Sequence, residues 1–576
     1  MRSETLESRV IGRADIVAVC ILVAALSVFT GFSFAHLQQP IAQDDLDYLV
    51  AAETYYETGV PKKFNTADRI STYNPELYLQ LVVLSFRLFG ENEAAARLPG
   101  VVSGWLSIIL VFLATNSLAH GTRIERLRWA SLTSVLYALT PGLIQGVLIL
   151  SIDNTILIPS VLFLCWTFVQ YLVEQKIQWA VLVGLAVVIA LWGRVTTPLI
   201  VGVALIAYAL ASGSRAKSRQ VGIGALGVGT VLFLVTWYAY CAVLNVPFEG
   251  PFTYAWNAFL DKAGSLDLSQ IALNGLHFTL WVGLFPVVLV VVALVHRVRV
   301  FLTEAKVRPE DAFLLCGLSL GVGYLFIGGA IFGYPKYQAP AIPLLYIFSA
   351  VTLSPMRHEF IAAAATQKRI AMALVVIACL IQVFTLGDWI YVIRYQVREA
   401  LALMPSSYPA VRKEIAQHAV LFCAACGLVF AVARGLSLKT VTLLYTFSLG
   451  SCLGISILQA TAVYQTGYGY GERGTVEVAA YVRARVPIGS VVIVPQEVNY
   501  YLKIPGSTYW HNSLWTDTER LVQLLADRNT SGFVYSIATN TVFQIQAIVG
   551  NHAIQEVLQR NYMQQTIGTY RVWTRR

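Results

Sequence analysis

The chain has 576 residues, of which 57% are hydrophobic and 13% are charged, and its formal net charge at pH 7 is +9. Its mean hydropathy of +0.63 excludes an ordinary soluble globular protein. Apolar runs of about 16 to 23 residues recur along the sequence, and a run of that length spans the hydrocarbon core as a helix. The composition therefore predicts a polytopic membrane protein. Its positive charge needs no nucleic-acid partner, because basic loops beside anionic membrane lipid account for it.

The first apolar run, about 14–36, follows a segment that carries Arg2, Arg9 and Arg13. This segment lacks a small-residue cleavage site, so we expect an uncleaved first span that starts in the cytoplasm. The positive-inside rule also places the basic connections of the chain inside, namely 120–128, 212–219, 296–308, 357–369 and 433–439.

The apolar runs between these connections predict twelve further spans, near 96–118, 129–145, 155–173, 178–192, 197–212, 221–243, 276–295, 312–332, 339–355, 370–387, 419–434 and 440–462. With the first run they make about thirteen transmembrane helices in a membrane domain over residues 1–462. An odd number of spans places residues 463–576 outside. We expect the chain in the plasma or inner membrane.

The first external loop, about 37–95, is expected to hold two interfacial helices. Residues 74–90 are apolar, but a crossing there would place every later basic loop on the wrong side, so we predict a helix at the outer interface. Residues 45–59 have one apolar face and predict another such helix. Three aspartates, Asp44, Asp45 and Asp47, stand at its start.

The tail, residues 463–576, predicts a small external α/β domain. Its polar sequence alternates an expected helix at 474–486, a strand at 487–495, a helix at 516–529 with a capping box from Thr516, and a strand at 531–538. All eight cysteines fall in predicted spans, so no disulfide frames this domain. Two of them, Cys423 and Cys426, are interpreted as small packing residues rather than metal ligands.

Polar residues at the predicted external ends of the spans are the candidate site. Asp44 and Asp45 permit two interpretations, as helix-capping carboxylates or as a general base at the membrane surface. Asp153, Arg194 and Lys336, with Tyr337 beside it, lie on the same external side. Two cations at a lipid boundary suit a lipid phosphate, although side chains that only reach for headgroups would also explain them.

Several short motifs follow one another in a specific order. They are Asp44-Asp45 with Tyr48, then Pro75-Glu76-Leu77-Tyr78, Leu88-Phe89-Gly90 and Arg97-Leu98-Pro99. Further on stand "SIDNT" (151–155), "GRVTTPLI" (193–200) and "PKYQAPAIPLL" (335–345). Over about residues 1–460 this order resembles the GT-C polyprenyl-phosphate-sugar glycosyltransferases, in particular the aminoarabinose transferase and protein O-mannosyltransferase-like branch. The chain departs from the family pattern at Asp45, Asn74 and Glu76.

The resemblance implies an integral membrane glycosyltransferase with a GT-C fold. Such an enzyme moves a sugar from a polyprenyl-phosphate-linked donor to a hydroxyl or phosphate of a lipid, polysaccharide or protein acceptor, on the external face and with inversion. Asp44 would be the single carboxylate base, with Asp45 and Asp153 also catalytic. A divalent cation, Mg²⁺ or Mn²⁺, is left open. The implied substrate-binding residues are Arg194, Lys336, Tyr337, Arg97 and Tyr48.

Two other classes of protein remain as alternatives. A polytopic lipid or sugar transporter, or flippase, would also have many spans and a few buried charges. Transporters, however, carry their charges near the bilayer midplane, often within inverted repeats. Here the charges lie at predicted span ends and no repeat is visible. The second alternative is a non-catalytic membrane scaffold, and loss of sugar transfer on mutating Asp44 would exclude both.

Overall fold

The computed structural model describes residues 2–41, 44–62, 74–263, 281–327, 335–355, 444–454, 474–487, 489–503, 508–509, 517–536, 550–568 and 570–576, with a few isolated residues between 271 and 279. The described residues divide into two compact units. The helical unit takes its described residues from Met1–Leu37, Tyr48–Gly387 and Glu414–Ile457. The sheet unit takes them from Gln38–Asp47 and Leu458–Arg576. Each unit is described by itself.

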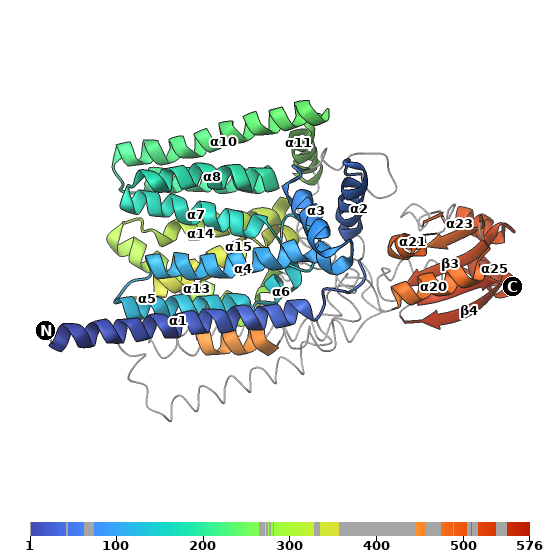
Figure 1. Cartoon of the computed structure of the whole chain (residues 1–576), viewed down its shortest axis with the longest axis horizontal. Helices are drawn as coiled ribbons and strands as arrows, with labels where there is room; N and C mark the ends of the chain where they lie inside the picture. The colour runs from blue at the N-terminus through green and yellow to red at the C-terminus, as the bar shows by residue number, and fades with distance from the viewer. Residues whose placement is uncertain are drawn as a thin grey trace, which may run out of the picture. The chain divides into compact units, whose positions relative to one another are not determined.

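Long helices dominate the helical unit and run side by side (Figure 1). Its labelled elements are α1 (Arg2–Phe34), α2 (Asp44–Thr58), α3 (Leu77–Phe89), α4 (Glu93–Leu118), α5 (Arg123–Ala138), α6 (Pro141–Gly146), α7 (Leu157–Glu174), α8 (Ile177–Gly193), α9 (Thr196–Ala211), α10 (Ala216–Leu244), α11 (Gly250–Ala263), α13 (Leu284–Glu304), α14 (Glu310–Ile327), the 3₁₀ turn η2 (Lys336–Gln338) and α15 (Ala341–Leu353).

Within the described residues, five helices are long and apolar enough to cross a membrane, and shorter apolar helices accompany them. The predicted spans at 96–118, 155–173 and 221–243 correspond to α4, α7 and α10. The helix starts follow ordinary capping chemistry: the Asn92 side chain accepts a hydrogen bond from the Ala95 amide at 2.9 Å and begins α4. The total of thirteen spans stays a prediction, because the runs at 370–387 and 419–434, with Cys423 and Cys426, lie outside the described residues.

Several predicted boundaries differ from the structure: α5 already begins at Arg123, within the connection predicted at 120–128, and α10 begins at Ala216, within the connection predicted at 212–219. Two further differences have clear physical causes. The run 129–145 was expected to be one span, but α5 ends at Ala138 and α6 begins at Pro141. Proline suits a first helical turn, where its missing amide hydrogen has no partner to lose. The connection predicted at 296–308 is helical as far as Glu304, because the charge of Arg297 is paired inside the protein rather than placed in a loop.

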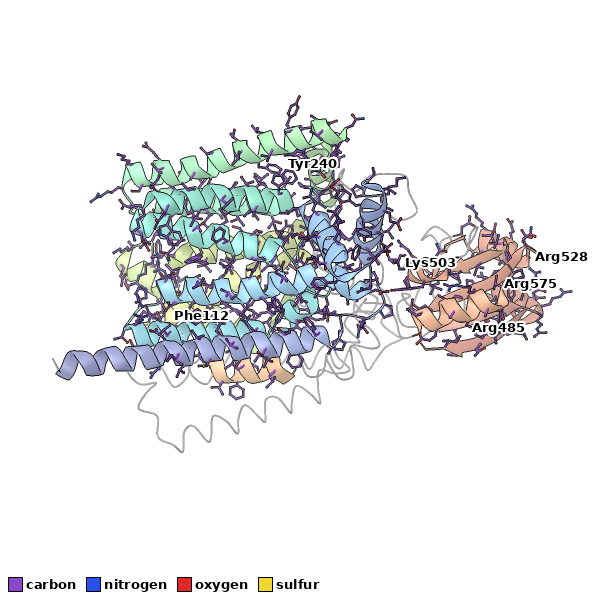
Figure 2. The ribbon with its side chains drawn as sticks, viewed as in Figure 1. Phe112, Tyr240, Arg485, Lys503, Arg528 and Arg575 are labelled. Atoms are coloured by element: carbon purple, nitrogen blue, oxygen red, sulfur yellow. The ribbon has the colours of Figure 1, made fainter. Side chains whose placement is uncertain are left out.

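Both helices expected in the first loop are present, as α2 and α3. At 15 and 13 residues they are shorter than the roughly 20 residues that a transmembrane helix needs. Figure 1 shows α2 running across the direction of the long helices. The buried carboxylate of Glu76, just before α3, accepts a hydrogen bond from the Tyr240 hydroxyl of α10, and Figure 2 labels this tyrosine. Their position at the membrane interface stays a prediction.

The sheet unit contains helices on both faces of a sheet that has five strands within the described residues. The strand order is β2-β1-β3-β5-β4, with β1 parallel to β2 and β3 and with β5 antiparallel to β3 and β4. The elements are α20 (Thr475–Arg485), β1 (Val491–Val494), α21 (Gln496–Leu502), β2 (Thr508–Tyr509), α23 (Thr518–Ala526), β3 (Thr530–Ser536), α25 (His552–Asn561), β4 (Tyr562–Ile567) and β5 (Tyr570–Arg575).

Alternation along the strands builds two cores in this unit. Val492 and Val494 of β1 face α20 and α21, whereas Ile493 between them packs with Leu521 of α23 and Ile554 of α25. The predicted α/β domain is confirmed. The side chain of Asp517 caps α23 by accepting the Arg520 amide at 3.0 Å, while Thr516, from which the capping box was expected, lies outside the described residues.

The start of the first loop also belongs to the sheet unit. The amide of Ile41, which is fully buried, donates to the Tyr501 hydroxyl at 2.9 Å. Tyr501 lies in the last turn of α21. Its partly buried ring packs against the core to which α20 and α21 contribute. Figure 2 labels basic side chains of this unit, among them Arg485, Lys503 and Arg575. A strand and a helix near the C-terminus thus share a unit with a segment from near the N-terminus.

Candidate active site

Helix α4 packs closely against the turn between α6 and α7, which carries Asp153 of the candidate site. Arg97 of α4 is fully buried, and its Nε donates to the Leu148 carbonyl at 3.0 Å while its Nη1 donates to the Leu37 carbonyl at 2.7 Å. A Cβ added at Gly100, one turn further along α4, would lie 2.1 Å from the Val147 carbonyl oxygen. Only glycine therefore permits α4 to approach this turn so closely.

Asp153 lies in this turn and is 1% exposed. Both of its carboxylate oxygens accept hydrogen bonds from Nη1 of Arg194, the residue that directly follows α8. The Nε of Arg194 donates to the Thr196 hydroxyl at 3.0 Å, at the start of α9. Because the pair is buried, the loss of either partner would leave the other charge uncompensated away from water, which is costly. The pair therefore holds the ends of α8 and α9 against the α6–α7 turn.

Aromatic rings surround a second cation next to this pair. Lys336 of η2 is buried, and its Nζ lies 5.9 Å from the ring centroid of Tyr337 and 5.9 Å from that of Tyr48 on α2. The guanidinium carbon of Arg194 lies 4.7 Å from the Tyr337 ring centroid. Both cations thus approach one ring, at distances typical of cation–π contacts. The Tyr337 ring in turn stacks on Tyr324 of α14 at 5.5 Å.

Tyr48 contributes a hydroxyl to this cluster. Its ring meets the buried ring of Tyr78 edge-on, with centroids 5.7 Å apart. Burial raises the pKa of Tyr48 above its usual value, although Lys336 acts in the opposite direction. The phenol therefore stays protonated at neutral pH and can donate a hydrogen bond. A guanidinium, an ammonium and a phenolic hydroxyl together form a set of donors suited to phosphate oxygens.

The structure places the other predicted residues differently. Asp44 is the first residue of α2, and Asp45 beside it is buried. Both belong to the sheet unit in the division of the chain, whereas Tyr48 of the same helix belongs to the helical unit. The catalytic roles of the two aspartates stay predictions. Arg97, predicted to bind substrate, is instead seen to hold two backbone carbonyls, and any contact with substrate likewise stays a prediction.

The cluster thus unites Asp153, Arg194, Lys336, Tyr337 and Tyr48, which had been expected on one side of the membrane, with Arg194 and Lys336 around one lipid phosphate. The sequence analysis missed Tyr324 and Thr196, and also two fully buried amides, Asn154 and Gln338. Asn154 lies within the motif "SIDNT" and Gln338 lies within "PKYQAP", and this position is the signal that would have found them. The described part of the chain contains no group of three His, Cys, Asp or Glu side chains that could hold a metal ion.

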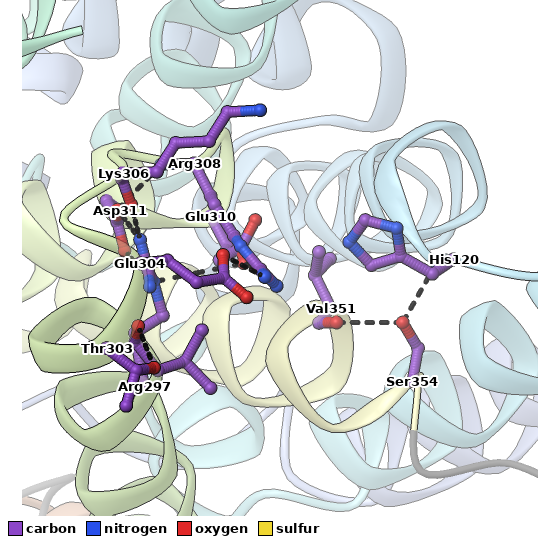
Figure 3. A network of polar contacts seen from close by, with 11 residues as sticks. His120, Arg297, Thr303, Glu304, Lys306, Arg308, Glu310, Asp311, Val351 and Ser354 are labelled. Atoms are coloured by element: carbon purple, nitrogen blue, oxygen red, sulfur yellow. Dashed lines mark hydrogen bonds and ion pairs between the residues drawn. The ribbon is translucent and has the colours of Figure 1, made fainter.

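A second charged cluster lies where the C-terminal half of α13 meets the start of α14 (Figure 3). The Nε of Arg297 donates to Asp311 at 2.6 Å and its Nη2 donates to the Lys306 carbonyl at 2.7 Å. Asp311 also accepts the Arg308 amide at 2.8 Å. Glu310 lies 4.0 Å from the guanidinium nitrogens of both arginines. These contacts close the turn between two consecutive helices.

A family model matches part of the chain, and solved structures match nearly all of it. The family model for dolichyl-phosphate-mannose-protein mannosyltransferases matches residues 74–240, which include α3, α4, Asp153 and Arg194. The structure of ArnT from Cupriavidus metallidurans bound to undecaprenyl phosphate is similar over 96% of this chain and 97% of that chain, with a TM-score of 0.58 and 14% identity. The likeness over nearly the whole of both chains shows that this chain has the fold of that ArnT.

The apo structure of the same ArnT is similar over 97% of this chain and 98% of that chain, with a TM-score of 0.57 and 15% identity. No curated protein sequence matches the chain. Because the fold covers nearly the full length of both chains, the GT-C likeness includes the helical unit and the C-terminal sheet. The predicted GT-C fold with a C-terminal α/β domain is confirmed, and several described helices are long and apolar enough to cross a membrane.

Proposed function

We propose that this GT-C enzyme transfers a sugar from a polyprenyl-phosphate donor to a hydroxyl or phosphate group of an acceptor. The observation that carries the proposal is the buried Asp153–Arg194 pair beside Lys336 and the rings of Tyr48 and Tyr337. The similar ArnT was solved with undecaprenyl phosphate bound, which supports a donor of this class. The acceptor is of the lipid, polysaccharide or protein class.

The two cations have a role in both binding and turnover. A sugar joined to a polyprenyl phosphate carries one negative charge on its phosphodiester. When the bond between the anomeric carbon and the phosphate oxygen breaks, the electron pair stays with the phosphate, which then carries about two charges. Lys336 and Arg194 would therefore bind the leaving phosphate more strongly than the donor, and an interaction that strengthens in the transition state accelerates the reaction.

Asp44 is the proposed general base. The acceptor hydroxyl attacks the anomeric carbon and gives its proton to the carboxylate, while the phosphate leaves from the opposite side, so the configuration inverts. Helical spacing supports this assignment, since residues four positions apart lie on the same face of a helix and Asp44 is four positions before Tyr48 in α2. Asp45 would orient the base, and Asp153 would act through Arg194.

A divalent cation, Mg²⁺ or Mn²⁺, would need carboxylates that are able to coordinate it. Among the described side chains, the Asp153 carboxylate is held by Arg194 and is not available as a simple ligand. The described residues of the helical unit therefore do not fit a resident metal at Asp153. No step of the proposed reaction uses one.

The reaction is proposed to take place on the external side of the plasma or inner membrane. The basic connections of the sequence support a cytoplasmic N-terminus by the positive-inside rule. In this arrangement residues 1–462 form the catalytic membrane domain, with the loop 37–95 at the external interface. Residues 463–576 form an external domain.

The proposal is tested with the full-length chain in lipid nanodiscs. Undecaprenyl-phosphate-linked mannose, glucose and arabinose serve as donors, with an extract of cell-envelope lipids and polysaccharides as acceptor, and release of undecaprenyl phosphate is measured. We expect release by the wild type, loss of release in Asp44→Asn, and little change in the control Asp47→Asn. Movement of an intact donor across the bilayer without release of undecaprenyl phosphate would identify a flippase and overturn the proposal.

A further inference from the structure

Three amide side chains are fully buried around the short helix α6: Gln145, Asn154 and Gln338. Gln145 lies within α6, and the Nδ2 of Asn154 donates to the carbonyl of Gly146 at its end. A Cβ added at Gly142 of α6 would lie 3.3 Å from the Ile342 side chain of α15. Since Gln338 precedes Ile342 by one turn, α6 lies beside the segment that carries it.

Two of these amides have polar atoms with no hydrogen-bond partner within the described part of the chain. They are Nε2 and Oε1 of Gln338 and Oδ1 of Asn154. Folded proteins pair nearly all buried polar groups with protein, water or ligand, so three such atoms in one region need an explanation. Asn154 follows Asp153 directly and Gln338 follows Lys336 by two positions. The unpaired groups thus belong to two different elements, each of which also carries a charged residue of the cluster.

The chemistry of these atoms restricts what can occupy them. Two of the three are carbonyl oxygens, which only accept hydrogen bonds, and a phosphodiester has no hydrogen to donate. A sugar hydroxyl both donates and accepts, so it can satisfy the carbonyl oxygens as well as the amide hydrogens of Gln338. We propose that Gln338 and Asn154 bind the hydroxyl groups of the donor sugar, next to the phosphate bound by Lys336 and Arg194. This inference rests on the proposed function and adds a specificity site to it.

The inference predicts a difference between two ligands that share a phosphate. Binding of undecaprenyl phosphate and of undecaprenyl-phosphate-linked mannose, glucose and arabinose is measured on the full-length chain in detergent. In Gln338→Leu we expect the best-bound sugar-bearing ligand to bind about tenfold more weakly, as for loss of hydrogen bonds to neutral groups. Bare undecaprenyl phosphate should bind within about twofold of wild type, because the substitution leaves the phosphate site intact.

Two control variants separate this effect from others. Gln170 is also a buried glutamine, on α7, and its amide contacts Ser117 away from the site. Gln170→Leu should bind every ligand as the wild type does. Lys336→Ala should weaken bare undecaprenyl phosphate and the sugar-bearing ligands alike. Gln338→Met, which nearly preserves the shape of glutamine, replaces the leucine variant if the latter does not fold.

Three results would overturn the inference. Equal weakening of bare and sugar-bearing ligands in Gln338→Leu would place this residue at the phosphate or in a purely structural role. Unchanged binding of every sugar-bearing ligand would show that ordered water occupies the amides. Absence of binding of any lipid phosphate to the wild type would overturn the proposed function itself, and with it the sugar site.

Discussion

The helical unit contains two buried charge clusters of similar composition and different origin. Arg297 and Asp311, near the ends of α13 and α14, are 14 positions apart and close a turn between consecutive helices. Asp153 and Arg194 are 41 positions apart, and their cluster also takes Lys336 from η2 and Tyr48 from α2. One cluster completes a local connection, whereas the other gathers side chains from four separate parts of the chain.

This difference separates a structural role from a functional one. Burying charge is costly even when the charges are paired, and apolar residues of similar volume often replace an ion pair without loss of stability. A local pair that satisfies a helix connection has a sufficient structural explanation. A pair that joins distant elements, lies against aromatic rings and borders buried amides has requirements that packing alone does not impose. The two clusters should therefore respond differently to substitution.

Arg194→Ala should have the largest effect. It removes a cation from the proposed phosphate site and leaves Asp153 buried without its partner, so we expect turnover to fall about 10²- to 10³-fold, as on removing one group that stabilises a developing negative charge. The folded state should lose about 3–5 kcal/mol. The double variant Asp153→Leu with Arg194→Met should regain stability but not activity. Recovery of activity in the double variant, measured as undecaprenyl phosphate release, would give this pair the same structural role as the Arg297 pair.

Lys336→Ala should slow transfer at saturating donor by roughly ten- to a hundredfold, the range expected for one charge-assisted hydrogen bond. The reduction should persist at saturation because the phosphate gains charge as the sugar leaves. The exposed Lys217 on α10 provides a matched control, since Lys217→Ala removes the same charge far from the cluster in sequence. Steady-state kinetics in nanodiscs distinguish the two. Equal rates in all three proteins would show that Lys336 only reaches toward lipid headgroups.

Arg297→Ala should separate stability from activity. Breaking the pair with Asp311 should destabilise the protein by about 3–5 kcal/mol, because the carboxylates of this turn lose their buried partner. The folded fraction should retain the wild-type turnover number. Thermal unfolding followed by intrinsic fluorescence and turnover per folded molecule provide the two measurements. A fall in turnover per folded molecule comparable to that of Arg194→Ala would erase the distinction between the clusters.

The smallest effect is expected in the sheet unit. Burial raises the pKa of Glu497, whose carboxylate accepts a hydrogen bond from Tyr570 at 3.4 Å. A raised pKa means that the folded state favours the neutral carboxyl, so its stabilisation is present at low pH and is lost as the pH rises through the folded-state pKa. Glu497→Gln stays neutral and should be more stable than wild type at pH 8 but not at pH 4.

Hydrogen exchange of the amides of β1 and β5, measured on the full-length protein, tests this expectation. Greater protection of the wild type at pH 8 would contradict it. The result bears on the comparison of clusters, because Glu497 is a buried carboxyl without a cationic partner at hydrogen-bond distance among the described residues. The Glu497 measurement shows how a buried carboxyl group behaves where no arginine compensates its charge.

Much of the helical fold could be predicted from the sequence because length and apolarity determine which segments become helices in a membrane. The predicted segments lie within a few residues of α4, α7, α8, α9 and α10. The failures have local causes. Pro141 starts a new helix inside a run that is apolar throughout, and hydropathy does not register this interruption. Arg297 suggested a loop, because its partner Asp311 could not be paired with it from sequence alone.

The candidate site was predictable in its members but not in its contacts. Charge and position at span ends indicated Asp153, Arg194 and Lys336, and the family resemblance supported them. That Asp153 holds Arg194 could not be foreseen, because pairing across 41 residues depends on how α8 meets the α6–α7 turn. Asn154 and Gln338 carry no charge and follow no spacing rule. Only the structure shows that their amides are buried.

The hydrogen bond from Ile41 to Tyr501 determines which parts of the chain can fold first during synthesis. Its two residues are 460 positions apart, and ribosomes add about 5–20 residues per second, so roughly 20 to 90 seconds of synthesis separate them. During that interval the segment that leads into Asp44 and Asp45 has no partner at position 501. The sheet unit, which includes both segments, can close only after residue 501 has been synthesised. A newly made chain therefore holds its early helices long before it can hold the aspartates in their final setting.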